Sequence, residues 1–136
     1  WDINAKSALI LGAGGAARAI IAGLQERNIE KITIVNRTRE RAEELALMSG
    51  GQVAVAEWSK LSFQLESADL VVNTTSLGMS GQPHLDLSLD PLGKNALVTD
   101  IVYVPLETNL LWQFLPLKIQ GWITLQSEHH CLYYPK

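Results

Sequence analysis

The feature that most constrains this chain is a run of glycine and alanine between a predicted strand and a predicted helix. Residues 7–11 (Ser-Ala-Leu-Ile-Leu) form a short apolar run, whose length and flanking glycines favour a buried strand. Gly-Ala-Gly-Gly-Ala-Ala follows at 12–17, and residues 15–27 have the small, apolar composition of a helix that lies close against a sheet. This strand–turn–helix context gives weight to the pattern G-x-G-x-x-G/A, which is weak alone.

The loop has the residues that a phosphate-binding turn needs. Gly12 can adopt a positive φ, Gly14 lets the backbone approach a pyrophosphate, and Ala17 is small enough for close helix–strand packing. The helix N-terminus offers unpaired N–H groups and a positive dipole end. We therefore favour nucleotide binding at residues 12–16 (Gly12, Ala13, Gly14, Gly15 and Ala16); a tight turn without a ligand is the alternative.

Strands and helices alternate along the rest of the chain. Further strands are predicted at 31–35, 52–56, 69–73 and 96–101, a helix at 39–48, a turn or short helix at 57–66, and the start of a helix at 106–113. Thr38 is a suitable N-cap for the second helix. The alternation predicts an α/β domain: a Rossmann-like, doubly wound parallel sheet in three layers.

The end of the second predicted strand distinguishes between two cofactors. A dinucleotide fold that binds NAD usually has an acidic residue here for the ribose 2′-hydroxyl. This chain has Asn36 and then Arg37, Arg39 and Arg41. Guanidinium groups bind a 2′-phosphate, which a carboxylate would repel, so the segment favours NADP over NAD. Ordinary surface arginines are the alternative.

Two later strand ends carry further candidates, because ligands of open α/β sheets bind at the carboxyl edge. The loop 73–79 (Asn-Thr-Thr-Ser-Leu-Gly-Met) offers hydroxyl groups for a diphosphate or a ribose, although a simple Ser/Thr/Asn turn is the better explanation of the loop taken alone. Tyr103 follows the strand at 96–101 and could donate a hydrogen bond to a substrate, or be a packed aromatic residue.

Composition excludes several classes of protein. The 136 residues fit one domain, and 11 Lys and Arg against 14 Asp and Glu give a net charge of −3, which does not suggest a nucleic-acid partner. There is no run of 18 apolar residues and no secretory signal, so we expect a cytoplasmic protein without a membrane partner. The single cysteine, Cys131, and the adjacent His129 and His130 lack zinc-site spacing, so no metal site is predicted.

Four segments together resemble the shikimate dehydrogenase family. They are Gly-Ala-Gly-Gly-Ala-Ala-Arg-Ala at 12–19, Asn-Arg-Thr with Arg41-Ala42 at 36–42, Asn-Thr-Thr-Ser-Leu-Gly-Met at 73–79, and Asp-Ile-Val-Tyr with Pro105 and Thr108 from position 100. The order and spacing match over about residues 1–111, and the second motif is typical of members that use NADP.

The resemblance implies a role for each matching residue. Residues 12–16 would hold the pyrophosphate, and Ile101 would border the nicotinamide, while Tyr103 would reach the substrate carboxylate. The adenosine ribose and its 2′-phosphate would be surrounded by Asn36, Arg37, Thr38 and Arg41, and Thr75 and Ser76 would lie along the cofactor. The family reaction is the reversible NADPH-dependent reduction of 3-dehydroshikimate to shikimate, in aromatic amino-acid biosynthesis.

The chain departs from the family in two ways. The family's catalytic Lys and Asp belong to an N-terminal substrate domain, so no catalytic residue is assigned here. Residues 112–136 lack the family's following Gln-containing segment and show no periodicity, so we expect the cofactor domain to cover 1–111, with a divergent tail. We hypothesise a frameshift or truncation near Leu111, which the other reading frames of the coding DNA would test.

Two classes of function follow. The first is the NADP-binding domain of a shikimate dehydrogenase, inactive alone, whose small-molecule substrate would be shikimate or 3-dehydroshikimate in the full-length enzyme. The second is a non-catalytic Rossmann-like nucleotide-binding fragment. A quinate/shikimate-type relative remains open within the first class, although Asn36 argues against NAD. A homodimer is compatible with the sequence.

Overall fold

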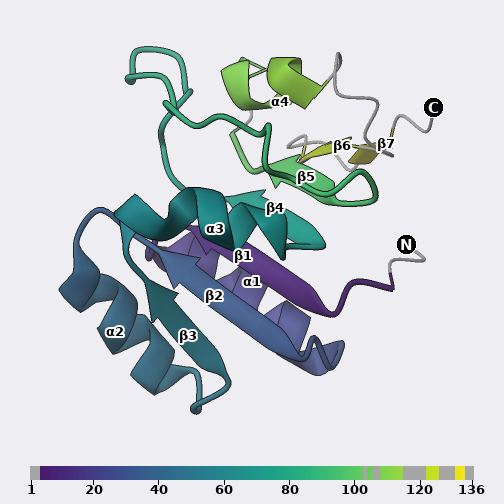
Figure 1. The fold of residues 1–136 in the computed structure, drawn as a ribbon. Coiled ribbons are helices and arrows are strands. Elements are labelled where there is room, and N and C mark those ends of the chain that lie inside the picture. Colours follow the sequence, from purple (N-terminus) through teal and green to yellow (C-terminus); the bar gives the residue numbers. More distant parts are fainter. Residues whose placement is uncertain (1–3, 103, 106–107, 115–121, 126–130, 134–136) are drawn as a thin grey trace.

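The structure is a computed structural model, which describes residues 4–102, 104–105, 108–114, 122–125 and 131–133 (Figure 1). The elements in chain order are β1 (Ser7–Leu11), α1 (Gly15–Glu26), β2 (Lys31–Val35), α2 (Arg39–Met48), β3 (Val53–Ala56), the 3₁₀ helix η1 (Trp58–Lys60), α3 (Leu61–Glu66), β4 (Leu70–Asn73), β5 (Leu97–Asp100), α4 (Asn109–Phe114), β6 (Trp122–Leu125) and β7 (Cys131–Tyr133). Every strand and helix predicted up to residue 113 is present, within one to three residues at each end.

The strands form one sheet in the order β3-β2-β1-β4-β5-β6-β7. All pairs are parallel except the antiparallel pair of β6 and β7. The first six strands follow the 3-2-1-4-5-6 order of dinucleotide-binding folds, which confirms the predicted Rossmann-like doubly wound sheet. In such a sheet the strand order reverses between β1 and β4, and ligands bind at the carboxyl edge there.

Two apolar cores cover the two faces of the sheet and give the predicted three layers. On one face, Ala17 and Ile21 of α1 and Leu45 of α2 pack against strand residues such as Ile10 and Ile34. On the other face the helices α3 and α4 cover the sheet, on the opposite side from α1 in Figure 1. An extended segment also covers this second face with the buried side chains of Leu85, Leu87, Leu89 and Leu92.

The turn from β1 into α1 has the geometry that its glycines predict. Gly12 has φ +107°, and a Cβ atom there would lie 2.8 Å from Oγ1 of Thr74. The Gly12 N–H donates to the carbonyl of Val35 over 2.9 Å, which ties the turn to the end of β2. Ala17 is fully buried, as expected of a small residue where the helix packs on the sheet.

The last two strands were not anticipated from the sequence. β6 and β7 fall within residues 112–136, where β6 extends the sheet beyond β5. They have four and three residues, too few to show a period of two in the sequence. The domain boundary at Leu111 stays a prediction. Within the described part of the chain, no helix has the length and apolar character needed to cross a bilayer.

Candidate functional site

The predicted functional residues converge on the carboxyl edge of the sheet. The register pairs Leu11, the last residue of β1, with Val35 on one side and with Asn73 on the other. Asn73 in turn lies beside Asp100, so four parallel strands end at one level. Thr74 donates to the carbonyl of Leu11 from both N (2.8 Å) and Oγ1 (2.7 Å), which holds the loop after β4 against the glycine turn.

The glycine loop presents an open backbone surface. A Cβ atom placed on Gly14 or Gly15 would meet no heavy atom within 4 Å. Gly14 is the N-cap of α1, has an extended backbone (φ −96°), and brings no capping side chain. The first N–H groups of α1 therefore face open space beside a positive helix end, which suits an anionic group.

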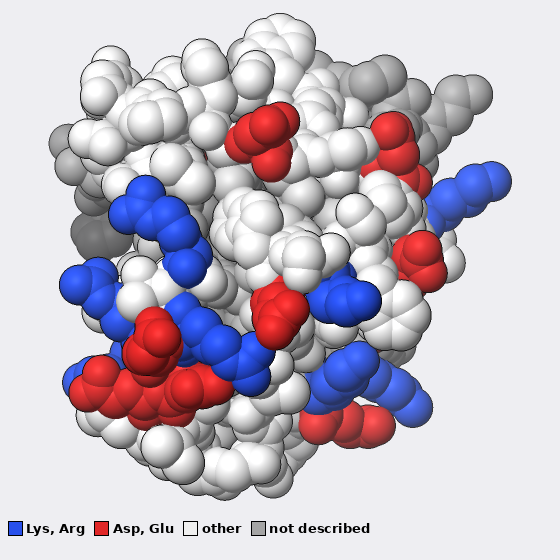
Figure 2. Space-filling model, turned by 60° about the vertical axis from the view of Figure 1, so that its left-hand side comes forward, with Lys and Arg blue, Asp and Glu red and all other residues white. Residues whose placement is uncertain are grey.

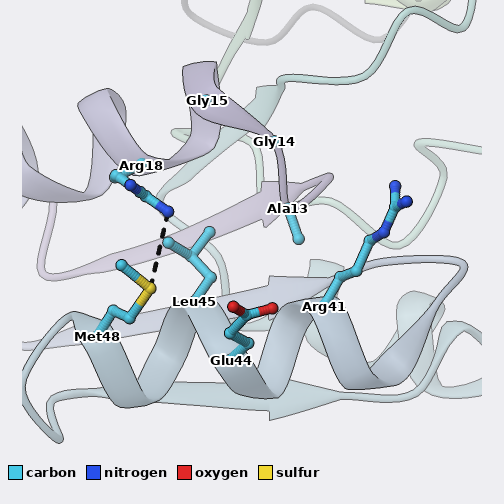
Figure 3. A pocket seen from close by; sticks show the side chains of 8 residues that line it. All are labelled: Ala13, Gly14, Gly15, Arg18, Arg41, Glu44, Leu45 and Met48. Atoms are coloured by element: carbon cyan, nitrogen blue, oxygen red, sulfur yellow. Dashed lines mark hydrogen bonds between the residues drawn. The ribbon is translucent and has the colours of Figure 1, made fainter.

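A cavity of about 250 Å³ lies between the glycine loop and α2 (Figure 3). It is lined by Ala13, Gly14, Gly15, Arg18, Arg41, Glu44, Leu45 and Met48. Arg18 is not among the residues predicted from the sequence; it donates from Nη2 to Sδ of Met48 over 3.7 Å. Its position three residues after Gly15, on the same helix face, is the signal that could have identified it.

The arginines at this site differ in their partners. Arg39 pairs with Glu43 (Nε to Oε1, 2.7 Å) and with Glu57 (Nη1 to Oε1, 3.2 Å), and the hydrogen bond that Arg39 donates to Glu43 raises the pKa of Arg39. No described carboxylate forms an ion pair with Arg18, Arg37 or Arg41.

Arg39 thus differs from Arg37 and Arg41, because two glutamates already pair with its guanidinium group. The role of these arginines at a phosphate stays a prediction. In Figure 2, basic and acidic side chains lie side by side over the displayed face.

A second cavity, of about 480 Å³, lies at the same sheet edge. It brings together four predicted cofactor residues from two distant segments: Asn36 and Arg37 after β2, and Thr75 and Ser76 after β4. Trp58, Leu77, Gln82 and Pro83 complete the lining. Trp58 is not among the residues predicted from the sequence. Its position directly after the third predicted strand is the signal that could have identified it.

The loop after β4 is shaped by its own side chains. Asn73 accepts hydrogen bonds at Oδ1 from the N–H (3.0 Å) and the hydroxyl (2.7 Å) of Thr75. The Thr75 hydroxyl also accepts from the N–H of Leu77 over 3.1 Å. The Thr75 side chain thus builds the turn, whereas Ser76 is exposed at the cavity.

A buried carboxylate supports this loop from the neighbouring strand. Asp100 accepts hydrogen bonds from Nδ2 of Asn73 (3.0 Å), the N–H of Val102 (3.0 Å) and Oγ1 of Thr108 (2.6 Å). Burial raises the pKa of Asp100 despite these donors. The network connects the ends of β4 and β5 with the start of α4.

The remaining predicted residues lie as follows. Thr38 is the N-cap residue of α2, but its side chain forms no capping bond; instead, Nδ2 of Asn36 donates to the carbonyl of Thr38 over 2.7 Å. Ala16 is in the first turn of α1, and Ile101 follows β5, donating its N–H to the carbonyl of Asn73. Tyr103 lies outside the described residues.

The absence of a metal site stays a prediction. No cluster of three or more His, Cys, Asp or Glu that could hold a metal ion occurs in the described ranges. His129 and His130 lie outside those ranges, and only the backbone of Cys131 is described.

Comparison with known proteins finds relatives from one family of enzymes. The shikimate / quinate 5-dehydrogenase family model matches residues 2–82. The shikimate dehydrogenase (NADP(+)) of Azorhizobium caulinodans is 52% identical over 111 residues, which cover 82% of this chain and 40% of that protein. The enzyme of the same name from Nitrobacter hamburgensis is 55% identical over 111 residues, 39% of its length.

Solved structures agree. Quinate dehydrogenase from Corynebacterium glutamicum in complex with NAD has a TM-score of 0.81 and 28% identity, covering 91% of this chain and 45% of that one. Shikimate 5-dehydrogenase from Thermus thermophilus in complex with NADP(H) and shikimate has a TM-score of 0.70 and 30% identity, covering 88% and 42%. The chain spans about two fifths of the length of the curated relatives that it matches. On its sequence and fold, the chain belongs to the shikimate / quinate 5-dehydrogenase family.

Proposed function

We propose that this chain is the NADP-binding domain of a shikimate dehydrogenase. The observation that carries the proposal is the set of arginines at the carboxyl edge, Arg18, Arg37 and Arg41, which have no carboxylate partner among the described residues. They lie beside an open helix N-terminus, and position 36 is an amide where NAD-binding folds usually have an acid. A doubly charged 2′-phosphate would supply the missing negative charge.

The proposed roles follow the strand ends. Residues 12–16 hold the pyrophosphate: Gly12 shapes the turn, and Gly14 and Gly15 leave the backbone accessible to the phosphates. Asn36, Arg37, Thr38 and Arg41 surround the adenosine ribose and its 2′-phosphate. Ser76 lies along the cofactor, and Thr75 holds the loop that presents Ser76.

The other end of the cofactor would lie over β4 and β5. Ile101 follows β5 at this edge and borders the nicotinamide, and Tyr103 would reach the substrate carboxylate. When bound, NADPH supplies the hydride that reduces 3-dehydroshikimate to shikimate, while the protein contributes binding and orientation. The relatives carry the name shikimate dehydrogenase (NADP(+)), which supports this choice of substrate, cofactor and place in aromatic biosynthesis.

A quinate dehydrogenase that uses NAD is the second candidate function, because the structure of such an enzyme in complex with NAD matches this chain with a TM-score of 0.81. Asn36 and the unpaired Arg37 and Arg41 favour NADP over NAD. The substrate assignment to shikimate rests on the curated relatives, which are about half identical to this chain over 111 residues.

A calorimetric titration of the purified chain with NADP⁺ tests the cofactor assignment. We expect saturable binding that Arg37→Ala weakens, whereas Lys31→Ala, which removes an exposed cation at the opposite end of β2, serves as the matched control. No binding at millimolar NADP⁺ would instead support a non-catalytic fragment that keeps the fold alone.

We also propose that the chain alone does not oxidise shikimate, because the family resemblance places the catalytic Lys and Asp in a preceding domain. Incubating the purified chain with shikimate and NADP⁺ should give no increase in absorbance at about 340 nm, where NADPH absorbs. Measurable turnover would show that a catalytic group has been overlooked.

A further inference from the structure

We propose that Trp58 is the surface on which the adenine ring of the cofactor stacks. This inference rests on the proposed function and adds a residue that neither the glycine loop nor the arginine segment suggests. Trp58 begins the short helix η1, directly after β3, and its side chain lines the 480 Å³ cavity at the carboxyl edge.

The position of the cavity identifies which part of a dinucleotide would occupy it. Asn36 and Arg37, proposed for the ribose 2′-phosphate, line the same cavity as Trp58. Adenine is joined to that ribose by a single bond, so the base must lie within a few ångströms of the 2′-phosphate. The nicotinamide belongs at the other end of the cofactor, beyond β1 and β4, near Ile101.

The chemistry of the cavity suits a flat purine. Trp58 is 37% exposed, which leaves part of this large aromatic residue accessible to a ligand in the cavity. Leu77 and Pro83 supply further apolar lining, and no Asp or Glu lines the cavity. Small-molecule sites combine apolar walls with a few polar groups in this way.

The segment that carries Trp58 is held in place from two sides. Glu57, the preceding residue, accepts a hydrogen bond at Oε1 from Nη1 of Arg39 (3.2 Å) and at Oε2 from Oγ of Ser59 (3.3 Å). The backbone carbonyl of Glu57 accepts from the N–H of Lys60 over 2.9 Å. Arg39 therefore connects η1 to the start of α2, beside the proposed 2′-phosphate site.

Stacking of a base on an aromatic side chain gives an effect large enough to measure. Removing such a platform by alanine substitution weakens binding by about fivefold to about 100-fold. Stacking needs an aromatic face but no particular hydrogen bond, so phenylalanine should replace tryptophan with only a small loss. Phe63 of α3 is the matched control, since it is 66% exposed and lines neither cavity.

The test is calorimetric titration of the full chain with NADP⁺ and with adenosine 2′,5′-bisphosphate, which contains the adenine half alone. We expect Trp58→Ala to lower the affinity for both ligands by about tenfold. The affinities of Trp58→Phe and Phe63→Ala should stay within about threefold of that of the unsubstituted chain. Unchanged binding by Trp58→Ala, or an equal loss in Phe63→Ala, overturns the inference while leaving NADP binding intact.

A second measurement covers the case in which Trp58→Ala does not fold. In the unsubstituted chain saturated with adenosine 2′,5′-bisphosphate, nuclear Overhauser effects should connect the Trp58 indole protons with the adenine H2 or H8 proton. Saturation without these effects overturns the stacking role alone. If the unsubstituted chain binds neither ligand, the proposed function fails and the inference falls with it.

Discussion

Two glycines of one loop are placed for opposite reasons. Gly12 has a positive φ, and a Cβ atom would lie 2.8 Å from Oγ1 of Thr74, so the fold needs glycine there. Gly14 has an extended backbone and open space around the position of a Cβ atom. The fold has room for a side chain at position 14, and such a side chain would clash only with a bound ligand.

The first prediction separates these two roles. Gly12→Ala should lower the free energy of unfolding by roughly 1–3 kcal/mol, the range for a residue forced into a disfavoured backbone region. Gly14→Thr should leave the midpoint of urea unfolding within error, because Thr and Gly are similar N-cap residues, and yet weaken NADP⁺ binding at least about tenfold, since the side chain would occupy the phosphate position. Equal stability losses in both variants would contradict the open surface assigned to Gly14.

The charges around the α1–α2 cavity give a second prediction. Arg41 and Glu44 both line it, so the site contains one carboxylate that would repel a phosphate. Arg41→Ala should weaken NADP⁺ binding by about tenfold or more, and Glu44→Gln should strengthen it by about two- to threefold. Both variants should leave NAD⁺ affinity nearly unchanged, and parallel changes for the two cofactors would argue against a 2′-phosphate within reach of Arg41.

At the scale of elements, the buried hydrogen-bond network links β4, β5 and α4 through one carboxylate. Asp100 accepts from Asn73, Val102 and Thr108, and its burial raises the pKa above the ordinary 3.8. The folded state therefore holds the proton more tightly than the unfolded chain does. The contribution to stability is fully present below pH 3.8 and is lost as the pH rises through the folded-state pKa.

The third prediction concerns this pH dependence. The free energy of unfolding, measured in urea at a series of pH values upward from 3.8, should contain a falling component that Asp100→Asn removes. Asparagine keeps an acceptor for Asn73 and Val102, and its amide can donate to the Thr108 hydroxyl, so the variant should fold. An unchanged slope in the variant would show that Asp100 titrates alike in both states.

The sequence predicted the elements well where local chemistry and packing agree. The residues after each parallel strand gather at one edge in any doubly wound sheet, so Gly14, Asn36 and Ser76 could be grouped without coordinates. No strand is predicted at residues 85–90, although their leucines alternate with polar residues and are buried in alternation, as in a strand. In the structure this segment pairs with no described strand, and its leucines pack over one face of the sheet.

The side chains of the site were less predictable than the backbone. Arg37, Arg39 and Arg41 look equivalent in the sequence, yet only Arg39 has Glu43 one turn further along the helix and Glu57 across from it. Trp58 and Arg37 line the same cavity because β2 pairs with β3, and the sequence does not specify that pairing residue by residue. Both the pairing of Arg39 with Glu57 and the position of Trp58 depend on contacts between different elements of the fold.

At the scale of the whole molecule, the net charge of −3 opposes the binding of a polyanion. Affinity for NADP must then come from short-range contacts with a few guanidinium groups, whose charges salt screens. The fourth prediction follows: raising the ionic strength from about 0.05 M to about 0.5 M should weaken NADP⁺ binding several-fold and NAD⁺ binding much less. Equal salt dependence for both cofactors would contradict a charge-based recognition of the 2′-phosphate.

The central claim is that the carboxyl edge of this sheet recognises a 2′-phosphorylated dinucleotide. It is tested most directly by the ratio of the dissociation constants of NAD⁺ and NADP⁺, measured by calorimetry on the same sample at low ionic strength. The unpaired guanidinium groups of Arg37 and Arg41 predict that NADP⁺ binds at least about tenfold more tightly. Equal affinities, or tighter binding of NAD⁺, would contradict the account.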